Sequence, residues 1–125
     1  MKEADRASVV KVFSQTDFND FARLSGDDNP IHTDPGFCTG TRFGRTVAHG
    51  LLLCSVLRGL IDRVAPGARL SEQSVMFPAP TYAGEAMRFA ITVRDRSTGD
   101  VTLDLEVKRI GDGVVTCQGQ ARLVL

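Results

Sequence analysis

The segment from Thr46 to Val64 limits the possible folds more than any other part of the chain, because it is apolar on nearly every side. Its first three turns leave little polar face, and charges appear only towards its end, at Arg58, Asp62 and Arg63. A proline and a glycine follow shortly afterwards and end the helix that this pattern predicts. Such a helix would be about 30 Å long. Because a helix that is apolar nearly all round is normally buried, the rest of the chain must surround it.

The second half of the chain shows the period-two pattern of β-strands. Apolar and polar residues alternate through three segments, around 88–94, 101–108 and 115–125. This alternation indicates strands with one buried and one exposed face. Turn residues at 97–100 and 111–113 separate the segments. We therefore expect these strands to pair as an antiparallel meander.

Two further strands and a short helix complete the predicted elements. β-rich residues predict strands over Ser8–Phe13 and Gln73–Phe77. Capping residues followed by apolar residues at helical spacing predict an amphipathic helix over 16–25, with Gly26 after its end. The sequence as a whole predicts a single α+β domain over 1–125, in which a five-stranded antiparallel sheet wraps around the long helix.

The balance of charges excludes some classes of function. Lys and Arg together number 15, as do Asp and Glu, so the formal net charge is zero. Nucleic-acid binders usually carry a basic excess, and a neutral chain has no electrostatic attraction to an anionic membrane. We therefore expect no nucleic-acid or membrane partner, whereas near-zero net charge favours self-association.

Cysteine usage and apolar runs favour a cytoplasmic location. The three cysteines form no CxxC pair, so a reducing compartment fits better than a disulfide framework. The charged start, Met1 to Arg6, has no apolar segment behind it that could act as a signal peptide. The longest apolar run, Leu51–Leu57, is too short to span a bilayer.

A long loop over 26–45, rich in Gly, Pro and Asp, contains the most reactive side chains. Long loops tend to be either functional or disordered, and the His, Phe and Ile residues in this loop favour an ordered, functional one. Asp27 and His32 lie five residues apart, and Asn29-Pro30 forces a bend between them. A carboxylate and an imidazole that share one water can pass protons in both directions near neutral pH. The loop is therefore the predicted catalytic centre.

The predicted helix offers a second functional group near its start, at His49-Gly50. The first turn of a helix has unpaired backbone N–H groups and the positive end of the helix dipole. A glycine lets a ligand approach this backbone closely. We expect developing negative charge on an oxygen atom to be stabilised there.

These residues form two motifs that resemble those of the MaoC-like hydratase family. The motifs are Asp27-x-Asn29-Pro30-x-His32-x-Asp34 and Ala48-His49-Gly50-Leu51. Phe77-x-x-Pro80 and Gly84-Glu85 are also similar, so the resemblance covers about 18 to 125. It implies a hot-dog fold, a homodimer with active sites at or near the dimer interface, and no metal or other cofactor. The implied reaction is reversible syn addition of water to a trans-2-enoyl thioester of coenzyme A or acyl carrier protein, which gives the (R)-3-hydroxyacyl product.

The resemblance also implies a role for each residue. Asp27 and His32 would hold the catalytic water, one removing its proton and the other supplying a proton to the α carbon. The Gly50 N–H would donate to the thioester oxygen, and Asn29 would orient the loop. His49 is expected to be a structural hydrogen-bonding residue or a substrate contact.

One position departs from the family pattern. This chain has Arg58 where some members carry a serine near the active site, and Ser55, one turn earlier, can take that place. An arginine beside the acyl pocket would shorten it or bind a carboxylated substrate, unless its side chain points to solvent.

Other readings of the same residues stay open. A metal site could use His32, Asp34, Cys38 and His49, but their spacing fits no common zinc pattern. A hot-dog acyl thioesterase would use the same acidic loop. A non-catalytic acyl-binding or structural subunit of a heteromeric hydratase would not need both Asp27 and His32.

Overall fold

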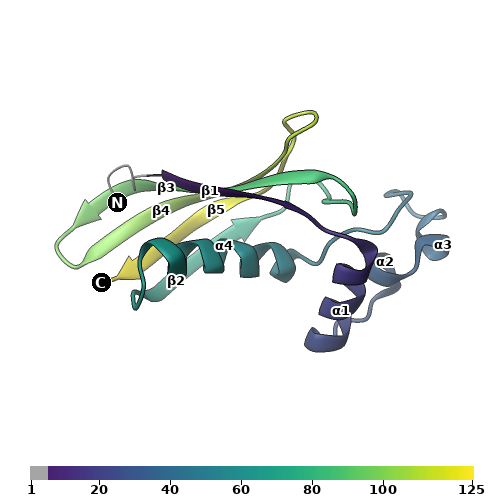
Figure 1. The fold of residues 1–125 in the computed structure, drawn as a ribbon, viewed down its shortest axis with the longest axis horizontal. Coiled ribbons are helices and arrows are strands. Elements are labelled where there is room, and N and C mark those ends of the chain that lie inside the picture. Colours follow the sequence, from purple (N-terminus) through teal and green to yellow (C-terminus); the bar gives the residue numbers. More distant parts are fainter. Residues whose placement is uncertain (1–5) are drawn as a thin grey trace.

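One antiparallel sheet and one long helix make up most of the structure, a computed structural model that describes residues 6–125. The strands lie in the order β1-β3-β4-β5-β2. Their bounds are β1 Arg6–Val12, β2 Arg69–Met76, β3 Ala86–Ser97, β4 Asp100–Arg109 and β5 Val115–Val124. Figure 1 shows the sheet curving over α4 (Gly50–Val64). This arrangement confirms the predicted hot-dog fold.

Three shorter helices gather beyond the amino end of α4 (Figure 1): α1 (Gln15–Ser25), α2 (Pro30–Thr33) and α3 (Pro35–Cys38). The charged start of the chain, Met1 to Asp5, lies outside the described residues.

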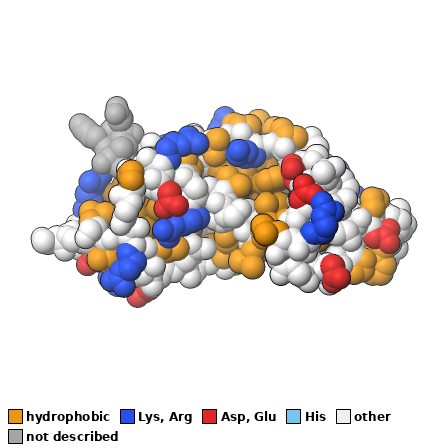
Figure 2. All heavy atoms as spheres, turned by 60° about the horizontal axis from the view of Figure 1, so that its bottom comes forward, with side chains coloured by type: hydrophobic (Ala, Val, Ile, Leu, Met, Phe, Trp, Pro, Cys, Tyr) orange, Lys and Arg blue, Asp and Glu red, His pale blue; other side chains and the backbone are white. Residues whose placement is uncertain are grey.

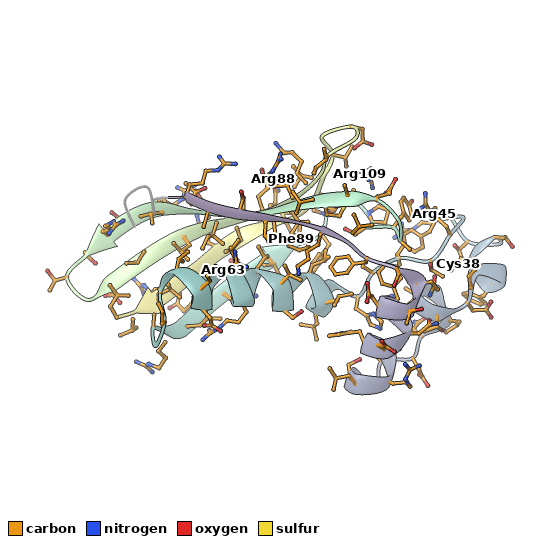
Figure 3. The ribbon with its side chains drawn as sticks, viewed as in Figure 1. Cys38, Arg45, Arg63, Arg88, Phe89 and Arg109 are labelled. Carbon is orange, nitrogen blue, oxygen red and sulfur yellow. The ribbon has the colours of Figure 1, made fainter. Side chains whose placement is uncertain are left out.

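The alternating pattern corresponds to the inner face of the sheet. Every second residue of β4 from Val101 to Val107 is buried. Figure 3 shows Phe89 of β3 directed towards α4 and its neighbour Arg88 directed away from it. Leu57 and Ile61 of α4 are buried in the same core. Each such side chain stabilises the fold by about 1.5–3 kcal/mol, so the sheet and α4 hold each other in place.

The predicted start of the long helix, Thr46, is wrong, because the residues just before Gly50 are not helical. Their hydrogen bonds go to segments distant in the sequence: the Val47 N–H donates to the Ile31 carbonyl (3.0 Å) and the Ala48 N–H to the Thr81 carbonyl (2.8 Å). These tertiary hydrogen bonds outweigh the local helical pattern. As a result, Gly50 is the first residue of α4 and lies at the edge of the loop region.

The expectation that α4 is buried on every side is also wrong for a single chain. Leu51 is 70% exposed, and Ser55 lies on the same open side. Figure 2 shows hydrophobic side chains gathered across the middle of the face on which α4 lies. Within residues 6–125, no helix combines the length and apolar character needed to cross a membrane.

The predicted helix over 16–25 is confirmed as α1. The Ser14 side chain accepts from the Asp17 N–H at 3.1 Å and the Asp17 carboxylate accepts from the Ser14 N–H at 2.8 Å, which together form a capping box. Gly26 ends the helix with a φ of 80°, a value that glycine tolerates best. The predicted loop over 26–45 contains two single-turn helices, α2 and α3, each with a proline in its first turn.

A pair of glycine variants tests the packing of β5 against β2. A Cβ on Gly119 would lie 1.9 Å from the Ser74 carbonyl oxygen, so Gly119→Ala should destabilise the fold by about 1–3 kcal/mol. Gly59 in α4 has no heavy atom within 4 Å of such a Cβ, so Gly59→Ala should stabilise it by about 0.5–1 kcal/mol. Urea unfolding measures both, and equal midpoints for the two variants would contradict the close approach of these strands.

Candidate active site

The bent loop brings Asp27 and His32 close together. Asp27 follows the left-handed end of α1, and His32 lies in the last turn of α2. The Asn29 side chain caps α2 by accepting from the Ile31 N–H at 3.1 Å. The Asp27 Oδ2 and His32 Nε2 atoms are 3.8 Å apart, which is too long for a direct hydrogen bond. The separation allows one water molecule to bond both groups.

A backbone carbonyl determines which nitrogen of His32 carries the proton. The Nδ1 atom lies 2.8 Å from the Val47 carbonyl oxygen, which can only accept, so Nδ1 carries the hydrogen. In the neutral ring, Nε2 therefore presents its lone pair towards Asp27. The His32 side chain is 10% exposed and that of Asp27 is 58% exposed. The imidazole is thus held in the wall of the site, whereas the carboxylate reaches solvent.

Gln15 ties the surrounding elements to His32. Its Nε2 group donates to the His32 carbonyl at 2.9 Å, and its Oε1 atom accepts from the Thr46 hydroxyl at 2.5 Å. A residue of α1 thereby joins α2 to the extended segment before α4. No sequence pattern pointed to this contact, because it links residues far apart in the chain.

His49 supports both members of the pair. Its Nε2 lies 2.8 Å from the Asp27 carbonyl oxygen, so it donates to the backbone of Asp27. Its ring stacks on His32, with centroids 3.7 Å apart, and meets the Phe21 ring edge-on at 4.9 Å. The side chain is buried. This geometry fits the structural hydrogen-bonding role, and because His49 also lines a cavity beside the pair, its role as a substrate contact stays a prediction.

The metal ligands considered from the sequence are not brought together as a set of four. Asp34 caps α3 by accepting from the Phe37 N–H at 3.1 Å, and the Cys38 thiol donates to the Ile31 carbonyl at 3.4 Å. Within residues 6–125, the group that gathers is Asp27, His32 and His49, with ligand atoms within 4.8 Å of one another. The two imidazole planes lie only 22° apart, so their in-plane lone pairs run side by side and do not converge as tetrahedral coordination requires.

The thiols are poorly suited to act as nucleophiles. Burial raises the pKa of the Cys38 thiol, and the nearby Asp34 carboxylate raises it further. Burial also raises the pKa of Cys54, an effect that a hydrogen bond with Gln73 opposes. Burial raises the pKa of Cys117 to about 12. Because the thiolate is the reactive form, these thiols are expected to be unreactive near neutral pH.

Gly50 places a free backbone donor beside the pair. As the first residue of α4, it has an N–H group without a partner inside the helix. The Phe77 ring lies directly against Gly50, and a Cβ there would come within 2.6 Å of the ring. A side chain at position 50 therefore requires the Phe77 ring to move away from the helix backbone.

Two cavities meet at these residues. A larger cavity of about 580 Å³ and a smaller one of about 380 Å³ are both lined by His32, Gly50 and Phe77. Asp27 lines only the smaller cavity. A ligand that reaches from one cavity to the other must therefore pass His32 and the start of α4.

The structure does not bring Ser55 or Arg58 to the site. The Ser55 hydroxyl donates to the Leu52 carbonyl at 2.7 Å, and Arg58 pairs with Asp62 at 3.1 Å. Neither residue lines either cavity. The predicted substrate contact through Arg58 thus finds no support in the chain's own geometry, because an acidic residue one turn away holds the guanidinium.

Comparison with known proteins places the chain in a family. A family model described as a MaoC-like domain matches residues 2–115. The (R)-specific enoyl-CoA hydratase of Aeromonas caviae is 34% identical over 95 residues, which are 74% of this chain and 71% of that protein. The mitochondrial 3-hydroxyacyl-[acyl-carrier-protein] dehydratase of Arabidopsis thaliana is 34% identical over 85 residues, which are 68% of this chain and 51% of that protein.

Solved structures agree with these matches. An (R)-hydratase from A. caviae that is involved in PHA biosynthesis superposes with a TM-score of 0.90, at 31% identity, over 96% of this chain and 93% of that chain. The unliganded R-hydratase PhaJ1 from Pseudomonas aeruginosa gives a TM-score of 0.88 at 25% identity, over 95% and 78%. The chain therefore belongs to the MaoC-like family and is a lyase of the hydratase and dehydratase class.

Proposed function

We propose that the protein hydrates trans-2-enoyl thioesters to (R)-3-hydroxyacyl thioesters and catalyses the reverse dehydration. The observation that carries this proposal is the Asp27 carboxylate 3.8 Å from the lone-pair nitrogen of His32, beside the first N–H of α4. Relatives named as an (R)-specific enoyl-CoA hydratase and a 3-hydroxyacyl dehydratase support the reaction class.

Because the Nδ1 atom of His32 carries the proton, His32 and Asp27 take different roles in the reaction. His32 Nε2 removes a proton from the water as its oxygen bonds to the β carbon of the enoyl group. The same nitrogen then returns that proton to the α carbon. Asp27, an exposed carboxylate, accepts a hydrogen bond that orients the water and stabilises the transient imidazolium. Oxygen and hydrogen arrive from one side, which accounts for syn addition.

Gly50 stabilises the intermediate of this reaction. When the water adds, negative charge develops on the thioester oxygen as an enolate. The free N–H of Gly50 and the positive end of the α4 dipole favour that charge. A single donor of this kind typically contributes about 10²–10³-fold to the rate.

We also propose that the protein is a homodimer. Within residues 6–125, β2 is an edge strand that pairs with β5, so its other edge has unpaired backbone groups. Leu51, Met76 and Phe77 are exposed apolar side chains at or beside the site. A second copy that covers this edge would bury them and enclose the cavities. The solvent-facing side of α4 also exposes apolar side chains, which a second copy of the chain would bury.

Substitution of the pair tests the reaction. Asp27→Asn and His32→Gln should each lower kcat/KM for crotonyl-CoA hydration by about 10²–10⁴-fold, because each removes a group that handles the water's proton. The loss of enoyl absorbance measures the rate. Asp28→Asn, a change at the exposed neighbouring carboxylate, should retain wild-type activity. Release of free thiol from acyl-CoA without hydration would identify a thioesterase and refute the proposal.

A clash at the start of α4 tests the oxyanion site. Gly50→Ala pushes a methyl group into the Phe77 ring and should lower kcat/KM by up to about 10²-fold. The double variant Gly50→Ala with Phe77→Ala removes the clash and should recover part of the loss. A fully active Gly50→Ala variant would show that the Phe77 ring moves aside without disturbing the site, and would contradict a steric requirement for glycine at this position.

The oligomeric state can be measured directly. Light scattering after gel filtration should give twice the 13.5 kDa mass of one chain. A monomer that is active at micromolar concentration would rule out a dimer requirement, and a larger species that needs a second protein would indicate a heteromeric hydratase.

A further inference from the structure

We propose that the larger cavity binds the carrier arm of the thioester through three named side chains. In this proposal the Thr81 and Thr116 hydroxyls hydrogen-bond the amide groups of the arm, and Arg42 pairs with its phosphate. The inference rests on the proposed function and deepens it, because it names the residues that recognise the carrier.

The position of Asp27 indicates which cavity receives the acyl end of the substrate and which receives the sulfur end. Water held by Asp27 and His32 must attack the β carbon, so the acyl chain beyond that carbon extends into the cavity that Asp27 lines. Asp27 lines the smaller cavity only, whereas His32 and Gly50 line both. The sulfur side of the thioester therefore leaves through the larger cavity.

Two threonines in the wall of the larger cavity have buried hydroxyls that lack hydrogen-bond partners within residues 6–125. Thr81 is 3% exposed and Thr116 is 0% exposed, and neither Oγ1 atom has a hydrogen-bond partner in the described structure. Both residues line the larger cavity. Burying an unpaired hydroxyl is unfavourable, so these groups call for a partner such as a bound water molecule or a ligand. The amide groups of a pantetheine arm are hydrogen-bonding partners of the right kind.

Arg42 is an exposed cation in the wall of this cavity. It is exposed, lines the larger cavity and lies over the Phe43 ring at 4.9 Å. In the described residues, no carboxylate forms a salt bridge with it. A planar guanidinium with free donors is well matched to a phosphate group.

The neighbouring arginines are already paired. Arg109 lies 3.0 Å from the Glu85 carboxylate, and Arg45 lies 3.9 Å from it. Both also pack their guanidinium groups over the Tyr82 ring. Figure 3 shows Arg45 and Arg109 at the same end of the molecule. These two arginines brace the segment around Tyr82, which leaves Arg42 as the one of the three that can meet an incoming phosphate.

Substrates with and without phosphate test the role of Arg42. Wild type, Arg42→Gln and the control Arg88→Gln, an exposed arginine that lines neither cavity, are assayed with crotonyl-CoA, crotonyl-[acyl carrier protein] and crotonyl-pantetheine. Arg42→Gln should lower the ratio of kcat/KM for crotonyl-CoA to that for crotonyl-pantetheine roughly tenfold, because one charge-assisted hydrogen bond is lost. Arg88→Gln should leave the ratio unchanged.

The two carriers identify which phosphate Arg42 meets. An equal loss with crotonyl-CoA and crotonyl-[acyl carrier protein] identifies the phosphate attached to pantetheine. A loss with crotonyl-CoA alone identifies the phosphates of its nucleotide end. An unchanged ratio in Arg42→Gln overturns the assignment, whereas a wild-type protein that hydrates none of the three thioesters refutes the proposed function itself.

A valine replacement separates ligand binding from folding. Thr116→Val removes an unpaired buried hydroxyl at nearly constant volume, so the free protein should melt at a higher temperature. The same change should raise KM for crotonyl-pantetheine several-fold, because the hydroxyl's ligand partner is lost, and Thr81→Val should act likewise. If either variant melts lower and keeps its KM, its hydroxyl has a structural partner and the proposed contact is wrong.

Discussion

The hydrogen bond from the His32 Nδ1–H to the Val47 carbonyl, 2.8 Å long, is the contact on which the site depends. It orients the ring and leaves Nε2 as the free nitrogen. Val47 can accept because its segment is extended, and that segment is held by hydrogen bonds to Ile31 and Thr81. The same extension moves the start of α4 to Gly50 and so exposes its N–H. Backbone pairing in one short segment thus determines both which imidazole nitrogen carries the proton and where the first N–H of α4 lies.

In the proposed reaction, the arrangement of the two cavities separates recognition from chemistry. His32, Gly50 and Phe77 line both cavities, and in this proposal the reacting carbons and the thioester group lie beside them. Apolar and polar recognition can then be tuned on either side without moving the acid–base pair. Arg45 and Arg109 pair with Glu85 and hold the wall of the larger cavity, whereas Arg42 forms no salt bridge within residues 6–125 and, in the proposal, meets the ligand.

Much of the fold could be predicted, because alternation in the last strands and the apolar run of α4 are local signals. The pair Asp27 and His32 is predicted from the Asn29-Pro30 bend between them and from the family motif, and the structure brings the two side chains together. The start of α4 was misplaced because 46–49 has helix-compatible apolar spacing, while the hydrogen bonds that hold it extended come from distant residues. No sequence pattern marked Thr81 and Thr116 as candidate binding residues. Threonine is common in strands and loops, and only the structure shows that these two hydroxyls lack partners.

The single-turn helices α2 and α3 have a consequence for how the protein loses activity. Each is held by a side-chain cap, from Asn29 and from Asp34, and each spans four residues. Their buried side chains are His32 and Cys38, so little apolar surface resists local opening. Segments of this kind open at a lower free energy than the sheet that carries them. Gentle warming should therefore abolish catalytic activity while the sheet remains folded. Cooling should restore the activity without any refolding of the core.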